Sequence, residues 1–169
     1  VNSLSAKKFA SHFDNRVEGL KLDIRDFETL KSEMSKVDIV VNTTGPFFLF
    51  AEPILKAAIQ TNTHYFDICD DWEPTEKMLQ MNEDAKKANI TAIIGLGASP
   101  GLTNILAHIA ISELDEVRKV YTGWDMSAAK PESESSQSGV SAAMLHGIEQ
   151  MIGEVKIFKN GKFETVNYR

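Results

Sequence analysis

The sequence predicts an α/β fold: a doubly wound parallel sheet that is incomplete, followed by the beginning of a second α/β domain. Short apolar segments rich in β-branched residues alternate with helical patterns, which is typical of βαβ units. Right-handed crossovers between parallel strands place helices on both faces of such a sheet. The residues suited to binding follow the predicted strands, and open α/β sheets bind ligands at the carboxyl ends of their strands.

The elements follow in order along the chain. Residues 5–13 predict a short helix with Phe9 and Phe13 on one face, and residues 16–22 alternate as a strand. Residues 26–35 predict a helix with Asp26 as its N-cap, since this carboxylate can accept a hydrogen bond from the first turn. Further strands are predicted at residues 37–41, 64–68, 91–94 and 117–125, and further helices at residues 51–61, 74–89, 102–114 and 140–152.

The composition changes after residue 126. Residues 127–138 are polar and rich in serine, which predicts a flexible loop. Asn160 and Gly161 separate two alternating segments and predict a β-hairpin with a type I′ turn. We therefore expect two domains, residues 1–115 with the parallel sheet and residues 116–169 as the start of the second.

Charge and composition exclude several classes of partner. The formal net charge is -6 and no basic run is present, so nucleic acid is not an expected partner. No apolar segment approaches the ~18 residues that predict a membrane-spanning helix. The single cysteine, Cys69, fits a reducing compartment, and we expect a cytoplasmic protein.

A glycine-rich turn follows the strand predicted at residues 91–94. Its layout resembles the G-x-G-x-x-G loop that binds a dinucleotide pyrophosphate, but the spacing of Gly95, Gly97 and Gly101 is one residue longer. One hypothesis makes this turn the pyrophosphate site and Asp125 the ribose ligand. Asp125 lies farther along the chain than the ~20 positions expected of that residue, which disfavours the hypothesis.

Two further segments carry candidate chemistry. Gly45 and Pro46 follow a buried strand and leave the backbone open to a ligand, although an ordinary strand-to-helix turn would look the same. Asp67 ends the next strand, where it could hold an amine or orient an acid–base group. A metal site of His64, Asp67 and Asp70 is an alternative, but its spacing matches no compact zinc pattern and we predict none.

Other readings of residues 69–71 stay open. Cys69 is either a nucleophile or a semi-buried thiol, and the neighbouring carboxylates favour the thiol. Asp70 and Asp71 are either functional or part of a solvated loop in which a negative charge lies near a helix N-terminus.

Four motifs together resemble the saccharopine dehydrogenase-like (saccharopine reductase) family. They are V-D-I-V-V-N at residues 37–42, G-P-F at 45–47, H-Y-F-D at 64–67 and G-L-G-A-S-P-G at 95–101. Members of this family have an N-terminal Rossmann domain for NAD or NADP and a second α/β domain for substrate and dimerisation. The resemblance implies an oxidoreductase that transfers hydride at the C–N bond of an amino-acid-like substrate and forms a homodimer.

The resemblance also implies roles for individual residues. Asp67 would face the substrate as the catalytic residue. Gly97 would border the cofactor at the bend between the cofactor and substrate domains. The cofactor would be bordered by Asp23 and Ile24 at the adenine and by Thr43, Thr44, Gly45, Pro46 and Phe47 at the nicotinamide and its ribose.

The family's phosphate loop is expected upstream of residue 1. Residues 1–115 would then be the C-terminal portion of the Rossmann domain, and we expect residues 1–169 alone to be inactive. The alternative is a non-catalytic dinucleotide-binding or scaffold module with the same fold.

Overall fold

The computed structural model describes residues 3–123, 147–148 and 152–167. Contacts between residues divide the chain into two compact units, Val1–Ile105 and Leu106–Arg169. The predicted domain boundary after residue 115 stays a prediction. The predicted loop at 127–138 lies outside the described residues, as does most of the helix predicted at 140–152.

The first unit contains a parallel sheet of three strands in the order β1, β2, β3. The strands are Ile39–Asn42 (β1), His64–Asp67 (β2) and Ala92–Ile93 (β3). Asn42 pairs with Asp67, and Phe66 pairs with Ile93, so the three strands end at one edge. Three predicted strands are confirmed, and with them a partial Rossmann-like α/β fold.

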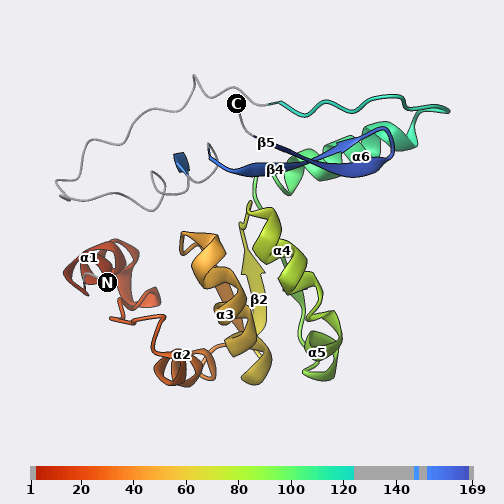
Figure 1. Cartoon of the computed structure of the whole chain (residues 1–169). Helices are drawn as coiled ribbons and strands as arrows, with labels where there is room; N and C mark the ends of the chain where they lie inside the picture. The colour runs from red at the N-terminus through yellow and green to blue at the C-terminus, as the bar shows by residue number, and fades with distance from the viewer. Residues whose placement is uncertain (1–2, 124–146, 149–151, 168–169) are drawn as a thin grey trace. The chain divides into compact units, whose positions relative to one another are not determined.

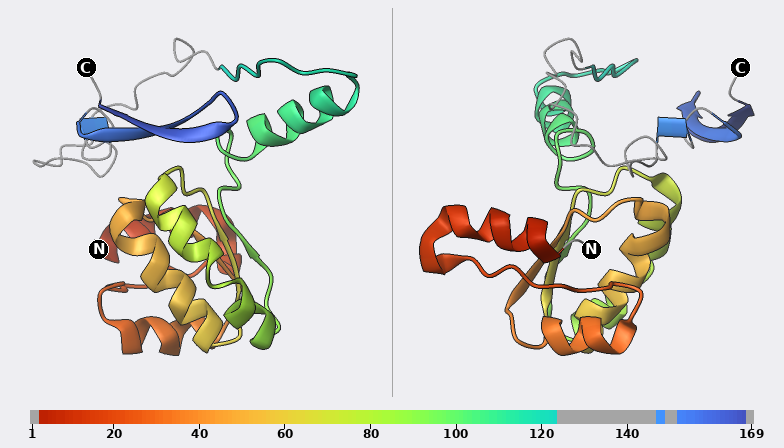
Figure 2. Two further views of the ribbon diagram at one scale, coloured as in Figure 1. Left: turned by 45° about the vertical axis from the view of Figure 1, so that its right-hand side comes forward. Right: turned by 90° about the vertical axis from the view of Figure 1, so that its left-hand side faces the viewer.

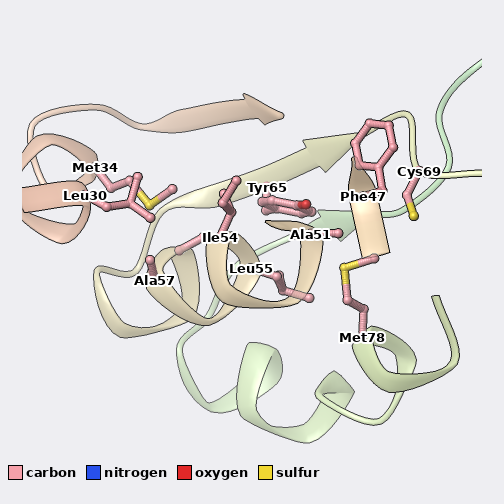
Figure 3. Close-up of a cluster of buried hydrophobic side chains, with 11 residues drawn as sticks. Leu30, Met34, Phe47, Ala51, Ile54, Leu55, Ala57, Tyr65, Cys69 and Met78 are labelled. Atoms are coloured by element: carbon pink, nitrogen blue, oxygen red, sulfur yellow. The ribbon is translucent and has the colours of Figure 1, made fainter. Parts of the chain in front are cut away.

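Helices cover one face of this sheet (Figures 1 and 2). They are α2 (Phe27–Met34), α3 (Phe47–Gln60), α4 (Trp72–Leu79) and α5 (Asn82–Lys87). Figure 3 shows Tyr65 of β2 packed among Ala51, Ile54 and Phe47 of α3. Tyr65, Leu55 and Met78 are among the largest fully buried side chains. Tyr65 is buried because strand residues at every second position point toward the helices.

The opposite face of the sheet stays open in the described residues of this unit. Its apolar side chains remain accessible, Ile39 at 48% and Val41 at 65%. The three strands follow one another in one direction, so right-handed crossovers bring their connecting helices to the same side. The described part therefore shows one half of a doubly wound arrangement.

Four predictions about secondary structure are corrected by the structure. The strand predicted at residues 16–22 is absent: residue 16 is helical, and residues 17–22 pair with no strand among the described residues. They follow α1 (Ser3–Ala10) and the 3₁₀ helix η1 (Ser11–Arg16), which together replace the single helix predicted at 5–13. Residues 117–123 are likewise not a strand, and the helix predicted at 74–89 is two helices, α4 and α5.

The segment at residues 17–23 is held by a close approach to α1. A Cβ atom at Gly19 would lie 2.6 Å from the backbone carbonyl carbon of Ala6, so only glycine fits there. Phe9 and Phe13 contact each other with ring centroids 5.0 Å apart, as their spacing in the sequence predicts.

The second unit contains the predicted hairpin. Strands β4 (Glu154–Lys159) and β5 (Lys162–Asn167) are antiparallel. Asn160 and Gly161 have φ angles of 54° and 78°, the left-handed values that a type I′ turn requires at both central positions. The predicted hairpin is confirmed. The remaining helix, α6 (Leu102–Ser112), begins in the first unit, and no helix among the described residues is long and apolar enough to cross a membrane.

The N-cap of α2 gives a first testable prediction. The carboxylate of Asp26 accepts hydrogen bonds from the amide of Thr29 at 3.1 Å and from its hydroxyl at 2.6 Å, and these bonds hold the pKa of Asp26 below its usual range. A lowered folded-state pKa stabilises the fold above the unfolded-state pKa of about 4, and the contribution is lost as the pH falls through the folded value. Asp26→Ala should therefore lower Tm at pH 7, and this difference in Tm should shrink below about pH 4. A difference that stays constant down to pH 2.5 would contradict the capping role.

Candidate functional site

The carboxyl ends of the three strands form the candidate site. β1 is followed by Thr43–Phe47, here called the 43–47 loop, and β3 is followed by residues 95–101, here called the glycine turn. Asp67 ends β2 between them. The structure thus brings together at one edge of the sheet the segments that the sequence places far apart.

Three buried polar residues connect these segments. Asn42, Tyr65 and Asp67 are exposed by 3%, 0% and 1%, and we call them the polar network. The amide nitrogen of Asn42 donates to the Tyr65 hydroxyl at 3.1 Å, and this hydroxyl donates to Oδ2 of Asp67 at 2.8 Å. The network therefore runs from β1 to β2 on the side of the sheet that the helices cover.

Asp67 is a tether in this structure. Its Oδ1 accepts hydrogen bonds from the backbone amides of Cys69 at 3.1 Å and Gly95 at 2.8 Å. Its backbone carbonyl accepts another from Leu96 at 2.8 Å. Both carboxylate oxygens are engaged and the side chain is almost fully buried, so in this structure Asp67 fixes the glycine turn to the end of β2.

Tyr65 is held in its neutral form. Burial raises the pKa of its hydroxyl far above the usual value, and the neighbouring Asp67 carboxylate acts in the same direction. The hydroxyl therefore keeps the proton that it donates to Asp67. Sequence reasoning missed Tyr65 and Asn42 as site residues. The available signal was the period of two that places Tyr65 on the same face of β2 as Asp67.

The 43–47 loop presents Thr43 and Thr44 to solvent. The amide of Thr44 donates to Oδ1 of Asn42 at 2.9 Å, which ties the loop to the polar network. Pro46 and Phe47 are buried where α3 begins, so their packing fixes the end of the loop. The exposed part of the loop is therefore short and anchored at both ends.

The side chain of Asp71 accepts a hydrogen bond from the first turn of α3. Its Oδ2 accepts a hydrogen bond from the amide of Phe48 at 3.1 Å. A carboxylate at this end of a 14-residue helix is favoured by the helix dipole. The prediction of a negative charge near a helix N-terminus is confirmed for Asp71, because Asp71 is also the N-cap residue of α4.

The contacts of Asp23 and Ile24 differ in kind from the buried hydrogen bonds of the polar network. Asp23 forms an exposed ion pair with Arg25 at 2.7 Å, and the hydrogen bonds from Arg25 hold the pKa of Asp23 well below its usual range. Ile24 is half-buried against the hydrophobic core. Their predicted position beside an adenine stays a prediction.

Three backbone amides of the glycine turn donate hydrogen bonds to other groups of the protein. Gly95 donates to Asp67, Gly97 to the Pro100 carbonyl at 3.0 Å and Gly101 to Oδ1 of Asn104 at 3.1 Å. A pyrophosphate loop needs free amides pointing at the ligand. The engagement of these three amides disfavours the hypothesis that this turn is itself the pyrophosphate site, which stays a prediction, and Asp125 lies outside the described residues.

Both backbone polar groups of Gly97 form hydrogen bonds with nearby backbone groups. Its carbonyl accepts from the amide of Leu102 at 2.9 Å, which starts α6 from the turn. The prediction that Gly97 borders the cofactor stays a prediction. Because its amide and carbonyl are already hydrogen-bonded, Gly97 would contribute by letting the cofactor approach its backbone closely.

The structure does not bring together the three residues of the metal alternative. His64 begins β2 and Asp67 ends it, so their side chains leave the strand roughly 10 Å apart. Nδ1 of His64 accepts a hydrogen bond from the amide of Thr91 at 2.9 Å. Among the described residues no group of three or more His, Cys, Asp or Glu side chains is placed to hold a metal ion.

Cys69 behaves as a buried thiol. Its side chain is not exposed, and burial raises the pKa of the thiol to about 11. We expect Cys69 of the native protein to react with iodoacetamide at pH 8 at least about 100-fold more slowly than in guanidinium chloride, since the thiolate is the reactive form. Mass spectrometry of the Cys69 peptide measures both rates, and equal rates would restore Cys69 as a candidate nucleophile.

Comparison with known proteins adds the family context. The family model described as saccharopine dehydrogenase NADP binding domain matches residues 2–93. The saccharopine dehydrogenase [NADP(+), L-glutamate-forming] of Pyricularia oryzae is 26% identical over 135 residues, which cover 79% of this chain and 29% of that protein. A saccharopine dehydrogenase-like oxidoreductase of Rattus norvegicus is 31% identical over 90 residues, 53% of this chain and 20% of that protein.

A solved structure shows the same fold. The apo saccharopine dehydrogenase (L-Glu forming) of Saccharomyces cerevisiae aligns with a TM-score of 0.57 at 22% identity, over 66% of this chain and 23% of that one. The chain thus spans less than a third of the length of each of these relatives.

Proposed function

The chain belongs to the saccharopine dehydrogenase NADP-binding domain family, and from this premise we propose that it serves an NAD(P)-dependent oxidoreductase acting on the C–N bond of an amino-acid-like substrate. The family match carries this proposal. It supports NAD or NADP as the cofactor, because the matched domain is an NADP-binding domain. The carboxyl edge of the sheet supports it independently, since this is where such folds bind dinucleotides.

The residues at this edge fit one side of the cofactor. Thr43 and Thr44 offer exposed hydroxyl groups, which can donate to and accept from a ribose or a carboxamide. Pro46 and Phe47 are buried, so their side chains do not compete with Thr43 and Thr44 for the solvent side of the loop. When bound, the nicotinamide supplies the hydride chemistry, and this chain's part is to bind and orient it.

For Asp67 we propose a positioning role in addition to the catalytic role that the sequence predicts. Its burial and its three donors support a positioning role, in which the carboxylate fixes the glycine turn against β2. Direct contact of Asp67 with a substrate amine stays a prediction. In the proposed mechanism Asp67 holds the edge of the site, and the orientation of the bound nicotinamide depends on that edge.

Cofactor binding tests the proposal directly. Titration of the natural full-length protein with NADPH, followed by its fluorescence, should show saturable binding. Replacing Thr43 and Thr44 together by Val should weaken this binding by about tenfold, which is about 1.4 kcal/mol. Thr165→Val on the exposed β5 strand is the matched control and should leave the affinity unchanged. Unchanged affinity in the double variant would remove the 43–47 loop from the cofactor site.

Turnover separates the proposed enzyme from a binding module. Absorbance at 340 nm, measured with NADP⁺ and candidate secondary or primary amino-acid amines, should rise in the natural full-length protein. NADPH binding without any such change over a broad set of amines would favour the non-catalytic module instead. A homodimer and a cytoplasmic location remain predictions alongside this proposal.

A further inference from the structure

We infer that Tyr65 is a positioning residue whose hydroxyl couples the 43–47 loop to the glycine turn, so that the two sides of the candidate site keep one fixed geometry. The catalytic meaning of this coupling rests on the proposed function. The coupling itself rests on four consecutive hydrogen bonds. They run from the Thr44 amide through Asn42, Tyr65 and Asp67 to the Gly95 amide.

The direction of these bonds is determined from both ends. The Thr44 amide can only donate, so it requires the carbonyl oxygen of Asn42. The Asn42 side chain must then turn its NH₂ group toward Tyr65, whose oxygen accepts. The single hydroxyl proton of Tyr65 is left for Asp67, which as a carboxylate can only accept. Each group therefore has one orientation compatible with its neighbours.

Burial makes an alternative arrangement costly. All three side chains of the polar network are at most 3% exposed, so water cannot replace a broken bond. Hydrogen bonds in such surroundings strengthen one another, and a buried donor or acceptor left without a partner is unfavourable. Loss of the central hydroxyl would leave both Asn42 and Asp67 with an unpaired group, and each of them holds one side of the site.

Amide hydrogen exchange tests the coupling without any ligand. In the natural full-length protein, Tyr65→Phe should raise the exchange rate in peptides covering residues 43–47 and 95–97 together, by about tenfold. Thr63→Val is the matched control, because it also removes one buried hydroxyl, which donates to the Met34 carbonyl at 3.1 Å near the amino end of β2. If both peptides exchange in Tyr65→Phe as they do in Thr63→Val, the coupling is refuted.

A second variant keeps the test decisive if Tyr65→Phe fails to fold. Asn42→Ser shortens the side chain that touches the 43–47 loop and leaves Asp67 intact. Coupling predicts faster exchange at residues 95–97 as well as at 43–47. A change confined to residues 43–47 overturns it.

Kinetics then tests the catalytic consequence. Tyr65→Phe should lower kcat by about tenfold while the Kd of NADPH changes by less than about threefold, because misplaced loops disturb orientation more than binding. An altered exchange pattern with unchanged kcat would refute the positioning role. If the wild-type protein binds no NADPH, the proposed function fails, and the exchange experiment still decides the coupling.

Discussion

Asp67→Ala is expected to lower the free energy of unfolding by at least about 3 kcal/mol, because it leaves three buried donors without an acceptor. These donors are the Tyr65 hydroxyl and the amides of Cys69 and Gly95. An unpaired buried donor costs about 1–3 kcal/mol, so three of them outweigh any single surface contact. Denaturant unfolding of the natural full-length protein, followed by circular dichroism, measures the loss.

Asp67→Ala should also lose activity under conditions in which the variant is still folded. Where the folded fraction is still above nine tenths, NADPH-dependent turnover should fall by about a hundredfold, since a displacement of about 1 Å at the reacting centre has such an effect. Asp70→Ala is the matched control, because Asp70 is an exposed aspartate three positions along the chain, and it should change stability by no more than about 0.5 kcal/mol. Equal effects of the two substitutions on stability and turnover would refute the tether role of Asp67.

Gly101→Ala is expected to lower the free energy of unfolding by about 3 kcal/mol or more, through backbone strain and a clash that act together. Gly101 has a φ angle of +117°, which residues with a Cβ atom rarely adopt. A Cβ there would lie 2.7 Å from the amide nitrogen of Gly97 and 2.8 Å from the carbonyl oxygen of Gly95. All of these neighbours are backbone atoms, so no side chain can move aside to make room.

Gly123→Ala is the control for this experiment. A Cβ at Gly123 meets nothing within 4 Å, and its backbone is not in the left-handed region. Thermal unfolding should show a large drop in Tm for Gly101→Ala and little change for Gly123→Ala. Similar Tm values for the two variants would mean that the glycine turn can relax, and that it is no rigid bend.

The candidate site was predictable in its location and less so in its contacts. Polar and glycine residues after three parallel strands are a local pattern, and the pattern placed Thr43–Phe47, Asp67 and the glycine turn at one edge. The turn's spacing also indicated a difference from a pyrophosphate loop, and the bonded amides of Gly95, Gly97 and Gly101 favour that interpretation. The partners of Asp67 were not predictable, because Gly95 lies 28 positions away in the sequence.

Local interactions explain the elements that the sequence determined by itself. The Asp26 cap is made with Thr29, three residues on, and the type I′ turn is made by Asn160 and Gly161 alone. The strands β1 and β3 are short apolar segments rich in β-branched residues, a composition that favours strands. Such features depend on neighbours in the chain, so the order of residues specifies them.

The tertiary structure alone decided the features that depend on distant partners. Residues 17–23 alternate like a strand yet pair with none among the described residues, since a strand exists only where another backbone meets its hydrogen-bonding groups. Asn42 and Tyr65 became site residues through a hydrogen bond that spans 23 positions. The tether role of Asp67, which stands beside its predicted catalytic role, was hidden from the sequence for the same reason. Burial and bonding are set by what folds against a residue, and the residue's own neighbourhood in the sequence does not reveal them.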